Sequence, residues 1–272
     1  MYFIRFSIYI IVFTIINISN LAFASEKYML LQTTTSLRDS GFLEYIIPEF
    51  NKYNDAQIRY VASGTGKALT NASVCNADLL IVHSEKDERE FIKNGYGSMR
   101  NALMYNQFVL ISPANNPANI SENDNISESF SKIADSKSVF LSRGDDSGTH
   151  KAETKFWNIA QIDPTLNSGG WYLETGLGMG STLNIAVNLD AYVLSDIATW
   201  LKYKNKSNHR LIAIKDDQLL NIYSIISINE KRCPEINYNL AALFKGWLLS
   251  SDGQAAIQSY TVDKKQLFHI YP

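Results

Sequence analysis

Three short clusters of hydroxyl-bearing residues and glycines recur along this sequence, and each could present hydrogen-bond donors to a small anion. They are residues 33–36 (TTTS), 63–66 (SGTG) and 147–149 (SGT). The third cluster precedes a run with apolar residues at helical spacing, so its backbone N–H groups would lie at a helix start, where anions bind favourably. Arg143, just upstream, adds a permanently charged donor. Together the clusters predict a site for a small oxyanion, lined almost wholly by donors.

Short apolar runs alternate with segments of helical periodicity after residue 28, which predicts repeated strand–loop–helix units. Such units form a parallel sheet covered by helices on both faces. Asp39 is expected to cap a helix over residues 42–50. The expected strands cover residues 28–32, 57–62, 77–83, 107–112, 138–141, 171–174, 191–194 and 219–228.

Two segments are expected to cross between two lobes. The first is the stretch 113–125, rich in Asn, Pro and Ala, and the second is the apolar run 219–228. We therefore expect residues 25–112 with 220–272 to form lobe 1 and residues 113–219 to form lobe 2. The cleft between them would be fed by loops at the carboxyl ends of strands. All three donor clusters fall in such loops.

Several sequence blocks resemble those of TupA-type tungstate-binding proteins, the solute-binding subunits of tungstate ABC importers. The blocks TTTSLRDSGFLEYIIPEF, SGTGKAL, SRGDDSGTH and WYLETGLGMGSTL stand in the family's order and spacing, and the resemblance covers nearly all of the chain after residue 24. It implies a two-lobe, type II-like periplasmic binding protein, with two parallel or mixed sheets joined by a two-segment hinge. It also implies high-affinity binding of tungstate, or molybdate, in the interlobe cleft and delivery to a permease in the inner membrane.

The resemblance also implies which residues line the site. The expected lining residues of lobe 1 are Thr34, Thr35, Ser36, Ser63, Thr65 and Gly66. Those of lobe 2 are Arg143, Ser147, Gly148, Thr149 and the backbone N–H of Met179. The family implies no cofactor, no catalytic residues and no directly bound metal cation, and the protein is expected to be a monomer.

The chemistry of the candidate ligands separates tungstate from phosphate. Tungstate and molybdate are fully deprotonated dianions at neutral pH, so a suitable pocket offers donors only. Phosphate keeps a proton on one oxygen and gains from an acceptor carboxylate. Asp39, Asp145 and Asp146 are the nearby carboxylates. Asp39 is better explained as a helix cap, and Asp145–Asp146 as a solvated turn or a partner for Arg143. A phosphate- or sulfate-type binding protein therefore stays the alternative.

A serine hydrolase is a less favoured alternative. Residues 145–148 (DDSG) have the residue types of a nucleophile loop, but the following glycine is missing. His83, the best-placed base, has no orienting acid apparent in the sequence. No residue set supplies a nucleophile, a base and an oxyanion hole together, so we expect no enzyme.

Composition and the N-terminus set the compartment. The formal net charge is −2, which argues against a nucleic-acid partner. Residues 1–24 have one positive charge, an apolar core and an A-x-A cleavage site, as in a secretory signal peptide. We therefore expect a periplasmic protein. Cys75 and Cys233 could form a disulfide or stay as two thiols, and the sequence leaves both possibilities open.

Overall fold

The computed structural model describes residues 28–272. The predicted signal peptide, residues 1–24, lies outside the described residues. Within the described range, no helix is both long and apolar enough to cross a membrane.

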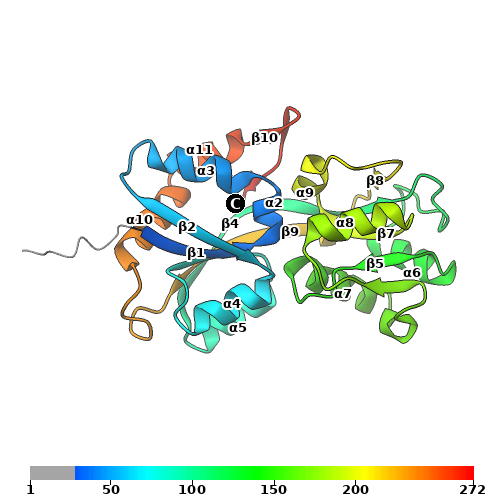
Figure 1. The fold of residues 1–272 in the computed structure, drawn as a ribbon, viewed down its shortest axis with the longest axis horizontal. Coiled ribbons are helices and arrows are strands. Elements are labelled where there is room, and N and C mark those ends of the chain that lie inside the picture. Colours follow the sequence, from blue (N-terminus) through cyan, green and yellow to red (C-terminus); the bar gives the residue numbers. More distant parts are fainter. Residues whose placement is uncertain (1–27) are drawn as a thin grey trace, which may run out of the picture.

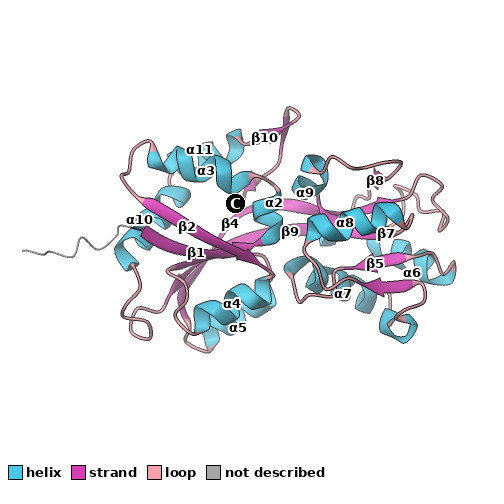
Figure 2. Cartoon of the chain, in the orientation of Figure 1, coloured by secondary structure: helices cyan, strands magenta, loops and turns pink. Residues whose placement is uncertain are grey.

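Ten strands form one connected, mixed sheet in the described part of the chain, in the order β2-β1-β3-β9-β4-β7-β5-β6, with β8 and β12 also paired to β4. Figure 2 shows strands of this sheet in both halves of the molecule. Their bounds are β1 Tyr28–Thr34, β2 Gln57–Ser63, β3 Leu79–Val82, β4 Gly97–Ser112, β5 Phe140–Ser142, β6 Tyr172–Glu174, β7 Tyr192–Asp196, β8 Arg210–Ile212, β9 Leu220–Ile228 and β12 His269–Ile270. A separate hairpin joins β10 (Thr261–Val262) and β11 (Lys265–Gln266).

The sheet has two halves with the same strand pattern, and these are the two lobes of the molecule (Figure 1). In the first lobe, β2, β1 and β3 are parallel and β9 runs antiparallel beside β3. In the second lobe, β6, β5 and β7 are parallel and β4 runs antiparallel beside β7. The long strands β4 and β9 also pair with each other. They therefore carry the chain between the lobes.

Helices cover both faces of each half of the sheet, as the alternating pattern predicted. In the first lobe they are α2 (Thr35–Asp39), α3 (Phe42–Asn51), α4 (Thr65–Ser73), α5 (Glu85–Lys93), α10 (Tyr238–Leu249) and α11 (Ser251–Ser259). In the second lobe they are α6 (Ile126–Asp135), α7 (Gly148–Ile159), α8 (Met179–Asn188) and α9 (Ile197–Lys202). Two 3₁₀ turns, η1 (Pro164–Asn167) and η2 (Asp217–Leu219), complete the described helical elements.

Alternate side chains of strand β4 pack into two different core clusters, one on each face of the sheet. Phe108 and Leu110 pack with α6 and α7, whereas Val109 and Ile111 pack with α8 and α9. Because successive side chains of a strand point to opposite faces, an unbroken apolar run fits a strand buried on both sides. The short apolar runs of the sequence are therefore a sound signal for this sheet.

Two expectations about local structure were wrong. Strand β4 begins at Gly97 rather than near residue 107, because the residues before 107 also pair with β9, with register shifts after Gly97 and after Ala102. This continuous strand also makes the two expected sheets one connected sheet. Asp39 is the last residue of α2, and Gly41, at φ 76°, is the N-cap of α3. The chain forms a helix directly after β1 because Thr34 caps it there.

The structure pairs Cys75 with Cys233 in a disulfide, with a Cα–Cα distance of 5.4 Å and a sequence separation of 158 residues. Cys75 follows the end of α4, and Cys233 lies between β9 and α10. The bond thus ties two surface loops of the first lobe together across most of the chain length.

Replacing both cysteines with serine is expected to lower the free energy of unfolding by about 2–4 kcal/mol, because the long loop is no longer closed in the unfolded chain. Urea denaturation of the oxidised protein and of the double variant would measure this difference. Reducing the wild-type protein should reproduce the shift, and equal midpoints for the oxidised protein and the variant would contradict it.

Candidate functional site

Four helix starts meet where the two lobes face each other. Helices α2 and α4 follow the carboxyl ends of β1 and β2, and α7 and α8 follow the ends of β5 and β6. Their N-caps are Thr34, Gly64, Ser147 and Gly178. Figure 1 places these four ends on the facing sides of the lobes. Helix starts carry unpaired N–H groups and partial positive charge, so this junction attracts anions.

The two N-caps that carry a hydroxyl group, Thr34 and Ser147, can still donate a hydrogen bond. Thr34 Oγ1 accepts a hydrogen bond from the backbone N–H of Leu37 at 3.3 Å, and Ser147 Oγ accepts one from His150 at 3.2 Å. Each cap uses a lone pair of its oxygen, so its own O–H proton is still available to a ligand. The prediction that Ser147 begins a helix is confirmed.

The glycine caps expose backbone donors instead. Neither Gly64 nor Gly178 makes a side-chain cap, so the first N–H groups of α4 and α8 are left without that partner. The side chain of Met179 packs in a core cluster of the second lobe, so this residue can offer the site only its backbone N–H.

Three buried hydroxyl groups at these helix starts have no hydrogen-bond partner. They are Ser36 Oγ in α2, Thr65 Oγ1 in α4 and Thr149 Oγ1 in α7, and their residues are 0%, 0% and 1% exposed. A buried hydroxyl without a partner is rare and costs about 1–3 kcal/mol. Because one comes from each donor cluster, the natural explanation is a ligand that accepts from all three.

Arg143 is the positive charge of the site and is only 2% exposed. Its Nη2 donates to Thr35 Oγ1 of the first lobe at 3.1 Å, and its Nε donates to the carbonyl of Leu177 at 3.3 Å. Gly176 N–H donates to the Arg143 carbonyl at 2.8 Å. The guanidinium also pairs with Asp145. Both its side chain and its backbone are therefore fixed.

The two lobes touch around this arginine. Gly66 N–H of the first lobe donates to the carbonyl of Asp146 at 3.4 Å. Lys151 Nζ of α7 lies 2.7 Å from an Asp87 carboxylate oxygen of α5 and 2.8 Å from one of Asp146. The described structure is thus closed at the site, with interlobe contacts at the Asp146 turn and at α7.

The carboxylates near the site are already engaged. Asp145 accepts from Arg143 with one oxygen and from Ser147 N–H, at 3.2 Å, with the other. Asp146 has a 69% exposed side chain that pairs with Lys151, and Asp39 pairs with Arg38 at 2.7 Å. A protonated oxyanion would therefore have to share a carboxylate that is already paired with a cation of the protein.

Not every expected lining residue offers a free donor. Ser63 is only partly buried, and its Oγ donates to the carbonyl of Gly64 at 3.3 Å. The N–H of Gly66 is directed at Asp146, as described above. Gly148 lies against His83 of the first lobe, where an added Cβ would be 2.6 Å from the imidazole ring. These three residues shape the closed interface more than they supply hydrogens.

The sequence analysis did not identify the residues that fix Arg143 through hydrogen bonds to its guanidinium and its backbone carbonyl. The loop after β6 supplies the Leu177 carbonyl, the Gly176 N–H and the hydroxyl of Thr175, which donates to the Arg143 carbonyl at 3.3 Å. Its glycines at 176, 178 and 180 are the signal that could have identified it. A glycine-rich turn that follows a strand and opens a helix is typical of close approach to a ligand.

His83 adds no positive charge to the site. Burial lowers the pKa of its imidazole to about 4, so the ring is neutral at physiological pH. Its Nδ1 lies 2.9 Å from Asn221 Oδ1, and the ring stacks on Tyr223 with 4.6 Å between centroids. His150 Nδ1 accepts from the N–H of Asp146 at 3.1 Å. Neither imidazole is therefore bonded to Ser147, and the geometry does not support a serine nucleophile.

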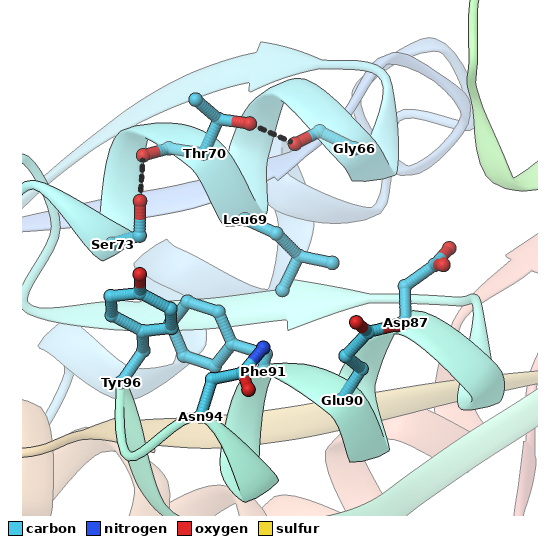
Figure 3. A pocket seen from close by; sticks show the side chains of 9 residues that line it. All are labelled: Gly66, Leu69, Thr70, Ser73, Asp87, Glu90, Phe91, Asn94 and Tyr96. Atoms are coloured by element: carbon cyan, nitrogen blue, oxygen red, sulfur yellow. Dashed lines mark hydrogen bonds between the residues drawn. The ribbon is translucent and has the colours of Figure 1, made fainter.

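Two surface hollows lie beside the site but have the wrong lining for a dianion. One, of about 250 Å³, lies between α4 and α5 and carries the carboxylates of Asp87 and Glu90 (Figure 3). The other, of about 770 Å³, lies along α7 and mixes lysines with Glu85, Asp87 and Asp146. Within residues 28–272, no group of three His, Cys, Asp or Glu residues could hold a metal ion.

Comparisons with known proteins agree with this geometry. A family model described as a PBP superfamily domain matches residues 22–252. The sequence is 40% identical to the tungstate-binding protein TupA of Peptoclostridium acidaminophilum, over 87% of this chain and 82% of that protein. The structure resembles the tungstate-binding protein TupA of Desulfovibrio alaskensis, with a TM-score of 0.75, 36% identity and coverage of 90% and 98% of the two chains. It also resembles the tungstate ABC transporter structure from Geobacter sulfurreducens, with a TM-score of 0.78, 36% identity and coverage of 86% and 99%.

Proposed function

Because this chain belongs to the PBP superfamily and, within it, to the TupA tungstate-binding proteins, we propose that it binds tungstate between its lobes and delivers it to an ABC importer. Its named relatives are binding proteins, so it is a binding protein and not an enzyme. Tungstate is its ligand rather than a cofactor. Molybdate, with nearly the same size and charge, is the expected second ligand.

The observation that carries this proposal is the set of three buried, unpartnered hydroxyls beside a buried arginine. All four groups donate, and together with backbone N–H groups at α4 and α8 they suit an anion whose oxygens all accept. Each charge-assisted hydrogen bond contributes about 1.5–3 kcal/mol, so six or so can give nanomolar affinity after the cost of closing the lobes.

We propose that the anion contacts come from residues of both lobes. The first lobe supplies donors from Thr34, Thr35, Ser36 and Thr65, and the second supplies donors from Arg143, Ser147, Thr149 and the N–H of Met179. Ser63, Gly66 and Gly148 line the site where the two lobes close around the anion. The first-lobe donors hold the anion before the Arg143 loop closes over it.

The proposal also covers domains, partners and compartment. We assign residues 25–112 with 220–272 to lobe 1 and residues 113–219 to lobe 2, with the last residues of β4 extending from lobe 1 into the sheet of lobe 2. The protein acts as a monomer with an inner-membrane permease and binds no nucleic acid, which is consistent with a net charge of −2. The signal peptide predicted at residues 1–24 supports a periplasmic location. So does the disulfide, because such bonds persist in oxidising compartments.

Competitive calorimetry with tungstate, molybdate, sulfate and phosphate tests the ligand assignment. Tungstate and molybdate are expected to bind at least about 100-fold more tightly than hydrogen phosphate, whose proton would face a hydrogen-bond donor and so remove one contact to the anion. Phosphate binding as tightly as tungstate would reject the proposal in favour of a phosphate-type binding protein.

Replacing Thr149 with valine is expected to weaken tungstate binding about tenfold without destabilising the free protein, because its hydroxyl has no partner there. The free energy of unfolding should stay equal or rise by up to about 1 kcal/mol. Calorimetry and urea denaturation would measure the two effects.

Thr182 provides a matched control, because it is 0% exposed and its hydroxyl is bonded to the Gly178 carbonyl at 3.1 Å. Thr182→Val should destabilise the protein by about 1–2 kcal/mol, since the partners of the hydroxyl lose a hydrogen bond. If Thr149→Val destabilised the free protein as much as Thr182→Val, the Thr149 hydroxyl would have a partner within the protein and would not be reserved for a ligand.

A further inference from the structure

Glu153 is a buried carboxyl group behind the anion site that the binding contacts do not use. It lies on α7 and is only 2% exposed. Thr149 precedes it by four residues, so the two side chains are neighbours on one face of the helix, about 5–6 Å apart at Cβ. Among the described residues, no cation forms an ion pair with Glu153. A lone carboxyl group inside a core is costly when ionised, so its position calls for a specific reason.

Three side-chain donors surround this carboxyl group. Ser142 Oγ donates to Oε2 at 2.8 Å, while Tyr172 Oη and Trp157 Nε1 donate to Oε1 at 2.8 and 3.1 Å. The donors come from β5, β6 and α7, so Glu153 joins the two strands to the helix that carries Thr149. A carboxylate accepting from three sides fixes the relative positions of these elements.

The link to the anion site runs through Ser142. Ser142 immediately precedes Arg143, and its Oγ also accepts from the N–H of Gly144 at 3.1 Å. The residues on both sides of Arg143 are therefore tied, through one hydroxyl, to Glu153. Moving or removing that carboxyl group would release the turn that aims the guanidinium.

The electrostatic surroundings of Glu153 leave it near its titration point at neutral pH. Burial is the main cause that raises the pKa of its carboxyl group to about 7, and the Glu174 carboxylate at the end of β6 adds to the rise. The hydrogen bonds from Ser142, Tyr172 and Trp157 act in the opposite direction. Two other ionisable groups lie near the site. They are the imidazole of His150, also on α7, and the guanidinium of Arg143, which follows β5.

We propose that Glu153 is a positioning residue for the Arg143 turn and that its carboxyl group takes up a proton from solvent when the site captures a dianion. This inference rests on the proposed function. A dianion bound against Thr149 lies about one helical turn from Glu153, and buried charges interact more strongly than charges in water because the effective dielectric constant is lower. Ligand binding therefore favours the neutral acid. The added proton can be donated to the hydroxyl oxygen of Tyr172 or Ser142, so the carboxyl group stays hydrogen-bonded in both states.

The sign of the effect follows from this linkage. Below pH 7 the carboxyl group is already neutral and does not oppose the anion, whereas above pH 7 it is charged and repels it. The tungstate dissociation constant should therefore rise about tenfold between pH 6 and pH 8.5, after allowing for partial neutralisation of the dianion by Arg143. The pKa of His83, about 4, lies outside this range.

Nuclear magnetic resonance of the ligand-free protein tests the positioning role directly. The indole N–H of Trp157 and the backbone amide of Gly144 are expected to shift together with a midpoint near pH 7, because both report on the Glu153 network. In Glu153→Gln neither should titrate. In Ser142→Ala the Trp157 signal should still titrate and the Gly144 amide should not, because only the link between them has been cut. If the Gly144 amide signal of the wild type did not titrate with the same midpoint as the Trp157 signal, the positioning role would be overturned.

Calorimetry in Pipes and in Tris at pH 7.5 tests the proton uptake. Wild-type protein should show a tungstate enthalpy that depends on the buffer, and Glu153→Gln should not. His150→Gln serves as the control and should keep the dependence, since burial lowers the pKa of His150 and its imidazole accepts from Asp146 rather than bonding to Glu153. A Glu153→Gln variant with the wild-type pH profile would overturn the proton uptake. If no anion bound at all, the proposed function would fail, while the ligand-free titration would still decide the positioning role.

Discussion

Replacing Arg143 with alanine is expected to weaken tungstate binding at least about 100-fold while leaving the fold intact. Arg143 is the buried cation among the proposed lining residues, and charge-assisted hydrogen bonds contribute about 1.5–3 kcal/mol each. Its loss removes the bonds from the guanidinium to the anion. It also leaves Asp145 without its cationic partner, so a carboxylate next to the site would repel the dianion.

The expected effect on stability is small, which separates a binding role from a structural one. Asp145 keeps the Ser147 N–H as a donor, and Thr35 loses one hydrogen bond at a partly exposed position. The free energy of unfolding of the ligand-free protein should fall by no more than about 1–2 kcal/mol. Thermal denaturation with and without tungstate would show both effects, because a ligand stabilises only the protein that binds it.

Arg143→Lys is the matched control. Lysine keeps the positive charge but lacks the planar fork that donates at once to Thr35, to the Leu177 carbonyl and to a ligand. Its affinity should lie between those of the wild type and Arg143→Ala. If calorimetry gave Arg143→Ala the same dissociation constant as the wild type, the guanidinium would not contact the anion. The proposed arrangement of the site would then be wrong.

Local signals in the sequence predicted the parts of this site that depend on local structure. Ser147 caps α7 because a hydroxyl before a helical run satisfies the first N–H groups wherever the run folds. The same reasoning failed at Asp39, since Thr34 had already begun α2. Two plausible caps five residues apart compete, and the choice between them depends on where β1 ends in the sheet.

Contacts between distant segments were beyond sequence reasoning. Nothing in the local pattern indicates that Leu177 would accept from Arg143, or that His83 would stand against Gly148. Both contacts require the two lobes to be placed against each other. The resemblance to a known family supplied the proposed members of the site, but only the structure distinguishes hydroxyls without a partner, such as that of Thr149, from those already hydrogen-bonded, such as that of Ser63.

The contact between Gly148 and His83 leads to the second large expected effect. Gly148 is the first residue of α7 in the second lobe, and His83 follows β3 in the first lobe. A Cβ at position 148 would lie 2.6 Å from Cε1 and Nδ1 of the His83 ring and 2.8 Å from its backbone oxygen. Such a contact is too short for any side chain, so either His83 or the helix must move.

His83 is poorly able to move. Its ring is hydrogen-bonded to Asn221 at 2.9 Å and stacked on Tyr223, and its backbone oxygen lies directly after the buried strand β3. The start of α7 is the freer element, because it moves with the second lobe. Gly148→Ala should therefore hold the lobes apart and separate Thr149 and Arg143 from the donors of the first lobe.

We expect Gly148→Ala to raise the tungstate dissociation constant by about 10- to 100-fold, which corresponds to the 1–3 kcal/mol that overpacking a tight contact typically costs. Small-angle X-ray scattering should show a radius of gyration with saturating tungstate that stays larger than that of the liganded wild type. Each lobe keeps its own core, so circular dichroism of the variant should be unchanged.

Gly246→Ala is the matched control, since Gly246 lies in α10 with nothing within 4 Å of an added Cβ. There the same substitution should leave tungstate binding unchanged and raise the free energy of unfolding by about 0.5–1 kcal/mol, because alanine favours helix more than glycine does. A Gly148→Ala variant that binds and closes like Gly246→Ala would show that the anion does not require the contact between α7 and His83. Closure of the lobes would then have to form the site through a different interface.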